Sequence, residues 1–194
     1  MQIYHHLKMF YEITAKSHVR VPPALMKENI KKALLQRLNE QFEGYINNEI
    51  GFVIHVTDIV KVGEGKIIAG DGAPYFETDF KFLTFIPELQ EVAIGKITDI
   101  TNFGAFINLG PVDGMIHVSQ TMDDFISFSK TKVLSGKQSK KSLKVGDKCR
   151  ARIIAVSFKD LANPKIGLTM RQPHLGNVLW EEKKAAKKKS DKEE

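Results

Sequence analysis

Residues 101–119 read TNFGAFINLGPVDGMIHVS, in which two phenylalanines flank a Gly-Ala pair and a Gly-Pro turn leads to a lone histidine. In a regular strand Phe103 and Phe106 would point to opposite faces, because successive side chains alternate. A bulge or a turn near Gly104 would bring both rings outward, and the small Gly-Ala pair would leave the surface beside them open. Without such a bend, one ring belongs to the core and Phe103 is the better candidate for the exposed one. The remaining alternative makes both rings ordinary core residues.

Working outward from this stretch, the second half of the chain consists of short β segments. ELQEVAIGKITDI, GAFINLG, GMIHVS, DKCRARIIAVSF and KIGLTM are five such runs, and Gly, Pro or Asn separates most of them. Five short strands without a long apolar helix predict a small closed barrel of the OB type. Residues 120–146 form a long connection between the third and fourth strands. We expect it to be irregular, and its Ser/Lys-rich part from Ser135 to Lys144 to be mobile.

The first half has a different pattern. A strand is expected up to Val21, where two prolines stop it because proline has no N–H for a sheet ladder. Apolar residues then recur at helical spacing, which predicts a helix from about 24 to 42 that ends before a left-handed Gly44. The β-branched run FVIHVTDIVKV and the segment FETDFKFLTFIP predict two further strands. The sum is an α+β domain, one helix on an antiparallel sheet.

Between those two strands lies KVGEGKIIAGDGAPYFE, which contains four glycines. No Gly-Lys-Ser/Thr ending opens a helix, so this segment is not a phosphate-binding loop. Glycines at this density favour turns and close backbone approach, and we expect loops at Gly63-Glu64-Gly65 and at Gly70-Asp71-Gly72.

The net charge of +6 is unevenly distributed. Residues 1–129 carry −5, residues 130–172 carry +10 and residues 173–194 carry +1. Such asymmetry indicates a polyanionic partner for one part of the chain only. The single cysteine, Cys149, excludes an internal disulfide and a multi-cysteine zinc site. With no apolar run long enough to span a membrane and no signal-peptide pattern, we expect a cytoplasmic protein.

Single-stranded nucleic acid is bound by aromatic platforms with cations around them. Phe103, Phe106 and His117 are the candidate platforms and contacts. The candidate cations lie on the last two strands of the barrel: Arg150, Arg152, Lys165 and Arg171. His55 is interpreted as an ordinary strand histidine.

A nuclease would need clustered carboxylates to hold divalent ions. The acidic pair Asp123-Asp124 is interpreted instead as a capping or surface feature. No catalytic residue, metal or cofactor is therefore predicted.

The run GKITDITNFGAFINLGPVDGMIHVSQ resembles the S-one RNA-binding module, an OB-type repeat, over about residues 89–172. The Phe-Gly-Ala-Phe and Gly-Met-Ile-His-Val-Ser groups carry the resemblance. It implies that Phe103, Phe106 and His117 occupy RNA-facing positions. That family often has an Asp and an Arg around the last hairpin, and the nearest counterparts here are Ser157 and Lys165.

VRVPP, FEG, VGEGKIIAGDGAPYF and FIPELQEV resemble the E-prime family of archaeal RNA polymerase subunits, counterparts of the seventh subunit of eukaryotic RNA polymerase II. The strings LGPVDGMIHVSQ and LTMRQPHLG extend the resemblance over almost the whole chain. It implies a non-catalytic stalk subunit that binds emerging single-stranded RNA and assists promoter opening, elongation or termination. It also implies a heterodimer with the F subunit of RNA polymerase, the counterpart of the fourth eukaryotic subunit.

By the same resemblance, residues 1–88 form a tip domain that docks on the polymerase core. Its contacts would be the Gly63-Glu64-Gly65 and Gly70-Asp71-Gly72 segments. Residues 89–172 form the RNA-binding barrel and residues 173–194 a segment with a charged tail. The alternative is a stand-alone RNA-binding protein of an exosome-cap or translation-factor type, which would leave the first 88 residues unexplained.

Overall fold

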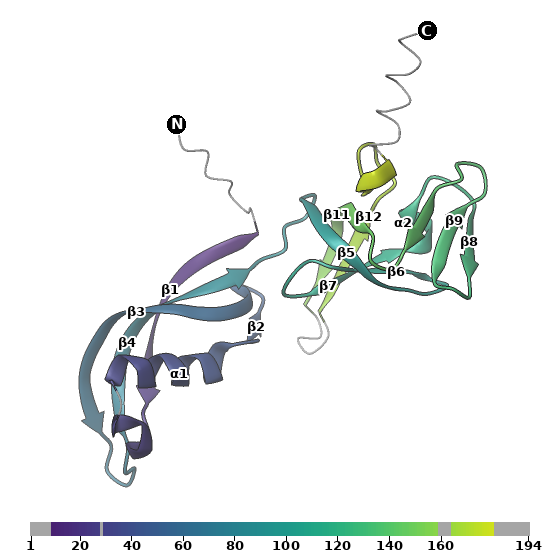
Figure 1. Ribbon diagram of the computed structural model, residues 1–194. Coiled ribbons are helices and arrows are strands. Elements are labelled where there is room, and N and C mark those ends of the chain that lie inside the picture. Colours follow the sequence, from purple (N-terminus) through teal and green to yellow (C-terminus); the bar gives the residue numbers. More distant parts are fainter. Residues whose placement is uncertain (1–8, 28, 159–163, 181–194) are drawn as a thin grey trace, which may run out of the picture. The chain divides into compact units, whose positions relative to one another are not determined.

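The computed structural model describes residues 9–27, 29–158 and 164–180, and the chain divides after Ile86 into two compact units (Figure 1). The N-terminal QIYHHLK and the Lys-rich tail from 181 to 194 lie outside the described residues. No helix in the described ranges combines the length and apolar character needed to cross a bilayer.

The first unit is one helix on an antiparallel sheet, which confirms the α+β prediction. Its sheet has the strand order β1-β4-β3-β2. The helix α1 contacts β3 and β1 on one face of it (Figure 1). The elements are β1 (Phe10–Arg20), the 3-10 helix η1 (Pro23–Lys27), α1 (Ile30–Phe42), β2 (Ile46–Asn47), β3 (Gly51–Ile67) and β4 (Pro74–Phe85).

The helix α1 begins six residues later than predicted. The chain after Pro22 and Pro23 makes a short 3-10 turn, and Asn29 then starts the α-helix by accepting a hydrogen bond from the Lys31 N–H at 3.0 Å. This side chain satisfies one of the N–H groups that a helix start leaves without a partner. The predicted end is correct, since Gly44 follows the C-cap with φ +75°.

The core of this unit lies between the helix and the sheet. Leu34 and Leu38 are completely buried on α1, and they face a cluster that includes Val56 and Phe80. The strand β3 has several register shifts against β4, and one of them lies between Val56 and Asp58. Asn39 of α1 accepts the Val56 N–H at 2.8 Å, so a helix side chain supplies the partner where the ladder is irregular.

The loop predicted at Gly63-Glu64-Gly65 is wrong, because these residues lie inside β3. A register shift separates Val62 from Gly65, and the Phe76 ring covers Gly65 so closely that a Cβ there would be 2.7 Å from it. Gly65 therefore allows the Phe76 ring to pack directly against the backbone of β3. The second predicted loop is correct: Gly70, Asp71 and Gly72 connect β3 to β4, and Gly70 has φ +88°.

The second unit is a closed five-stranded barrel. The strands follow the order β12-β7-β6-β5-β11, and β12 pairs with β11 to close the sheet. All five predicted strands and the OB-type architecture are confirmed. The elements are β5 (Val92–Ile100), β6 (Gly104–Asn108), β7 (Asp113–His117), α2 (Val118–Thr121), β8 (Ile126–Ser129), β9 (Val133–Gly136), β10 (Ser142–Lys144), β11 (Lys148–Ser157), β12 (Lys165–Thr169) and β13 (Gly176–Asn177).

The irregular connection predicted between the third and fourth barrel strands is instead a second, three-stranded sheet of order β10-β9-β8. Its strands are antiparallel, and short turns connect β8 to β9 and β9 to β10 (Figure 1). Leu134 and Leu143 are cross-strand partners and are completely buried, so β9 and β10 each contribute one core residue. Burial of these two side chains accounts for regular structure in a segment that is otherwise rich in serine and lysine.

Candidate nucleic-acid interface

Phe103 and Phe106 lie side by side and neither is sealed in the core, so the interpretation of both as core residues is wrong. Their ring centroids are 6.1 Å apart at 90°. On β6, Ala105 and Ile107 point inward, which leaves Phe106 on the outer face. Phe103 precedes the strand in a bend, and its ring is 46% exposed.

Hydrogen bonds on both sides fix this bend. The Thr101 N–H donates to the Gly104 carbonyl and the Val118 N–H donates to the Phe103 carbonyl, both at 2.8 Å. Gly104 is required for close approach, because a Cβ there would be 2.2 Å from the Ile116 oxygen of the neighbouring strand. Ala105 is fully buried, so the expectation that it opens the surface is wrong; it is a small core residue.

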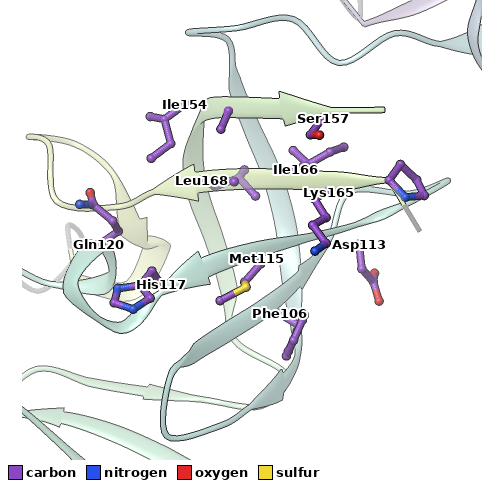
Figure 2. A pocket seen from close by; sticks show the side chains of 13 residues that line it. Phe106, Asp113, Met115, His117, Gln120, Ile154, Ser157, Lys165, Ile166 and Leu168 are labelled. Carbon is purple, nitrogen blue, oxygen red and sulfur yellow. The ribbon is translucent and has the colours of Figure 1, made fainter. Parts of the chain in front are cut away.

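The outer faces of β6, β7, β12 and the end of β11 enclose a groove of about 760 Å³ (Figure 2). Strand register explains the arrangement. Phe106 is the cross-strand partner of Met115, and Gly104 is the partner of His117 two positions along. The parallel partner of Met115 on β12 is Gly167, which has no side chain to fill the space. The side chains used below are Phe106, Met115, His117, Ile154, Ser157 and Lys165.

His117 and Lys165 lie toward opposite ends of this groove, with Met115 and Phe106 between them (Figure 2). The His117 Nδ1 lies 3.3 Å from the Ser119 N–H, from which it accepts, and 2.8 Å from the Ser119 hydroxyl. The neutral ring therefore carries its proton on Nε2, which leaves that N–H to donate to a ligand. The groove thus combines an apolar floor, an imidazole donor and an ammonium cation.

Lys165 and Ser157 are cross-strand partners at the end of the β11–β12 hairpin where the two strands are connected. In the sequence, these two positions are the nearest counterparts of the Asp and Arg that S-one modules often have. One carboxylate also borders the groove: Asp113, which accepts a hydrogen bond from the Asn108 side chain at 2.8 Å. Neither Ser157 nor Lys165 reproduces a carboxylate–guanidinium pair, so a cationic phosphate contact by Lys165 is the chemistry that this hairpin offers.

The three arginines predicted for the site do not line the groove. Arg150 and Arg152 point outward from β11, but in the part of the strand that pairs with β5, where their partners are Ile94 and Val92. Arg171 is bound to the Asp123 carboxylate at 2.5 Å. Of the predicted cations, only Lys165 is therefore brought together with the aromatic residues.

Met115 and Ile154 are among the groove residues that sequence reasoning missed. Met115 stands two positions before His117 on the same strand, so strand alternation alone identifies it as sharing the outer face. Ile154 lies at the register shift between Ile153 and Ala155 of β11. A bulge of this kind reverses which side chains point outward, and nothing in the sequence marks its position.

The acidic pair Asp123-Asp124 is structural, as interpreted. Asp123 binds Arg171, and the Asp124 carboxylate accepts the N–H groups of Gln138 and Ser139 at 3.0 and 2.7 Å. The Ser139 and Gln138 donors lower the pKa of Asp124 to about 2. Within residues 9–27, 29–158 and 164–180, no three His, Cys, Asp or Glu side chains come together as a metal site.

In the first unit, the residues predicted to dock on a partner lie at one end of the β3–β4 hairpin. Arg20 binds both carboxylate oxygens of Asp71, at 2.8 and 2.7 Å, and the Tyr75 hydroxyl donates to the same group at 2.8 Å. The Arg20 and Tyr75 contacts hold the pKa of Asp71 well below its usual range. The Asp71 carboxylate therefore binds partners of its own unit and holds the end of the β3–β4 hairpin in place. Ile67 and Ile68 are exposed at this end.

Two family models match the two units. Residues 16–72 match the "SHS2 domain found in N terminus of Rpb7p/Rpc25p/MJ0397", and residues 86–160 match the "S1 RNA binding domain". Both assignments agree with the α+β unit and with the barrel as described.

Similarity to curated proteins extends over nearly the whole chain. The chain is 38% identical to DNA-directed RNA polymerase subunit Rpo7 of Saccharolobus shibatae, covering 89% of this chain and 97% of that protein. It is 37% identical to subunit Rpo7 of Sulfolobus acidocaldarius over 92% of this chain and 98% of that protein. With DNA-directed RNA polymerase II subunit 7 of Arabidopsis thaliana it shares 26% identity over 75% of this chain and 82% of that protein.

Proposed function

The chain belongs to the Rpo7 family of DNA-directed RNA polymerase subunits, and from this membership we propose that it is the non-catalytic stalk subunit of such a polymerase and binds emerging single-stranded RNA. It is an accessory subunit, so the nucleotidyl transfer belongs to other chains of the complex. Its contribution to promoter opening, elongation or termination acts through contacts with RNA and with the polymerase core.

The observation that carries the RNA-binding part is the groove in which Phe106, Met115, His117 and Lys165 converge. Aromatic faces stack on bases of any sequence, while a lysine and an imidazole N–H bind phosphate oxygens. Phe103 extends this platform, since its ring contacts that of Phe106 edge to face. Such a surface binds single strands with little sequence preference and with strong dependence on salt.

For attachment to the polymerase core, we assign the end of the β3–β4 hairpin. It exposes Ile67 and Ile68 next to Gly70 and Gly72, and the Arg20–Asp71 ion pair holds its shape. Exposed apolar side chains on a preformed hairpin suit a partner surface that buries them. Gly63, Glu64 and Gly65 support this end as part of β3 rather than as a loop.

The remaining assignments rest on the family. Residues 1–88 are the docking domain, 89–172 the RNA-binding barrel and 173–194 a C-terminal segment. The chain forms a heterodimer with the F subunit of RNA polymerase. It is a cytoplasmic protein, because an archaeal-type polymerase transcribes DNA in the cytoplasm. Co-expression of the chain with the F subunit, followed by size-exclusion chromatography, tests the heterodimer: separate elution of the two chains would contradict it.

Copurification with the polymerase core tests the docking assignment. Deleting the hairpin end would shorten β3, so substitutions give the cleaner test. The double variant Ile67→Ser and Ile68→Ser should no longer copurify with the polymerase core. Its circular dichroism spectrum should match that of the wild type. Val60→Ser is the matched control, because Val60 is also an exposed β-branched residue of β3. Equal retention of both variants would refute docking through the hairpin end.

A further inference from the structure

Residues 126–144 form a second cationic surface that lies outside the groove. Six lysines occur between positions 130 and 144, and no acidic residue occurs from Phe125 to Gly146. The structure places Lys144 on β10 and the other five in the connections that join β8 to β9 and β9 to β10. We call this element the lysine sheet.

The lysine sheet has one apolar and one polar face. Leu134 and Leu143 are buried on the inner face. The register pairs Ser127 with Ser135 and Ser135 with Ser142, so three serines of successive strands share the outer face. Serine hydroxyl groups can donate to phosphate oxygens, and the Ser127 hydroxyl donates to the Ser135 carbonyl at 3.2 Å.

Most of the lysines keep their charge uncompensated. Lys132 binds Asp99 at 2.7 Å, and the Lys141 ammonium lies 5.2 Å above the Trp180 ring. The other four are exposed and form no ion pair with any residue that the structure describes: Lys130, Lys137, Lys140 and Lys144. Like charges gathered without partners repel one another, and a polyanion relieves that repulsion.

The turn that carries Lys137 and Lys140 has a fixed shape. Asp124 accepts the Gln138 and Ser139 N–H groups and also the Ser139 hydroxyl, at 2.8 Å. The Lys137 N–H donates to the Phe125 carbonyl at 2.9 Å. A preformed turn reduces the entropy that ligand binding must overcome.

One strongly exposed ring accompanies these cations: Phe125 is 72% exposed just before β8. Phe128 on β8 is 43% exposed, but it is the cross-strand partner of Leu134 and therefore belongs to the inner face. The strand β8 is an edge of its sheet, so nothing in the sheet covers it on that side. Bare ring faces beside lysines suit unpaired bases, whereas the bases of a duplex are already stacked.

A chain of contacts connects the lysine sheet to the groove. Lys132, in the β8–β9 turn, binds Asp99 on β5, and Asp99 is the cross-strand partner of Phe106. The turn therefore lies beside the strand pair that carries the groove's aromatic ring.

We propose that the lysine sheet is a second contact for the same single-stranded RNA. It binds phosphates through Lys130, Lys137, Lys140 and Lys144 and stacks a base on Phe125. The inference rests on the proposed RNA-binding function and lengthens its footprint beyond the barrel groove. Short RNA occupies the groove alone, and longer RNA reaches both.

Binding of two labelled oligouridylates to the full chain, measured by fluorescence anisotropy, tests the proposal. Their lengths are about four and about sixteen nucleotides, the limits of what one OB barrel covers. The variant replaces Lys130, Lys137, Lys140 and Lys144 by glutamine. Its affinity for the longer RNA should fall by at least about tenfold, and the slope of log K against log salt should become shallower by up to about 3. Its affinity for the short RNA should remain that of the wild type.

The matched control removes the same charge from exposed lysines of the first unit: Lys27, Lys31, Lys61 and Lys66. If both quadruple variants bind the longer RNA equally, the lysine sheet is no contact, while the groove proposal stands. An equal loss for single-stranded RNA and for duplex DNA would overturn the assignment to single strands. If the wild type binds neither RNA, the proposed function falls and this inference with it.

Discussion

Removing the two groove rings one at a time gives a quantitative test of base stacking. Stacking of a base on an aromatic side chain contributes about 1–3 kcal/mol, so Phe106→Ala should weaken binding of a short oligouridylate about 5- to 150-fold. Phe103→Ala should act in the same direction. Because the rings meet edge to face with centroids 6.1 Å apart, the double variant should show a coupling of about 0.5–1.5 kcal/mol in its unfolding free energy.

The assay is fluorescence anisotropy of the short oligonucleotide, together with urea unfolding of each variant. Tyr45→Ala is a matched control, because Tyr45 is an aromatic residue of the first unit with the same 46% exposure as Phe103. It should leave RNA binding unchanged. Wild-type affinity in a folded Phe106→Ala variant would refute the groove as the stacking site.

Three further predictions concern the stability and reactivity of the barrel unit. Gly104→Ala places a Cβ 2.2 Å from the Ile116 oxygen and should lower the unfolding free energy by about 1–3 kcal/mol or more, whereas Gly72→Ala, with open space around it, should be nearly neutral in the same urea titration. Asp124 has a pKa lowered to about 2, so it stabilises the fold above its unfolded pKa of about 4, and that stability is lost as pH falls from about 4 to about 2. Urea midpoints of Asp124→Asn should therefore change less over this range than those of the wild type, and parallel curves would contradict the assignment. Burial raises the pKa of the Cys149 thiol to about 12, so iodoacetamide at mildly alkaline pH should modify it only after denaturation, as mass spectrometry would show; rapid labelling of the native chain would contradict its burial.

The barrel strands could be predicted because each has several inward residues at alternate positions and ends at turn residues. Ile107 and Ile116 on neighbouring strands are examples, both fully buried. The strands of the lysine sheet could not be predicted in this way. Each has three or four residues, and β9 and β10 bury only Leu134 and Leu143 among their large apolar residues, so no period is visible.

The site was predictable where one motif holds it together. Phe103, Phe106 and His117 lie within fifteen residues, and a single β-hairpin brings them to one face. Whether the arginines of β11 reach the groove, in contrast, depends on which strands pair with β11. Arg150 and Arg152 alternate outward as expected, but Arg150 lies beside Ile94 of β5, and Arg152 lies between Val92 of β5 and Thr169 of β12. Neither lines the groove, and the sequence of one strand does not determine its neighbours.

The central claim is that RNA runs over the groove rings, and photocrosslinking tests it most directly. A short 4-thiouridine oligonucleotide bound to the full chain should crosslink at Phe103, Phe106 or Met115, which tandem mass spectrometry locates within the single tryptic peptide of residues 97–130. Crosslinks confined to the first unit, or to the residues around Arg150 and Arg152, would contradict the account.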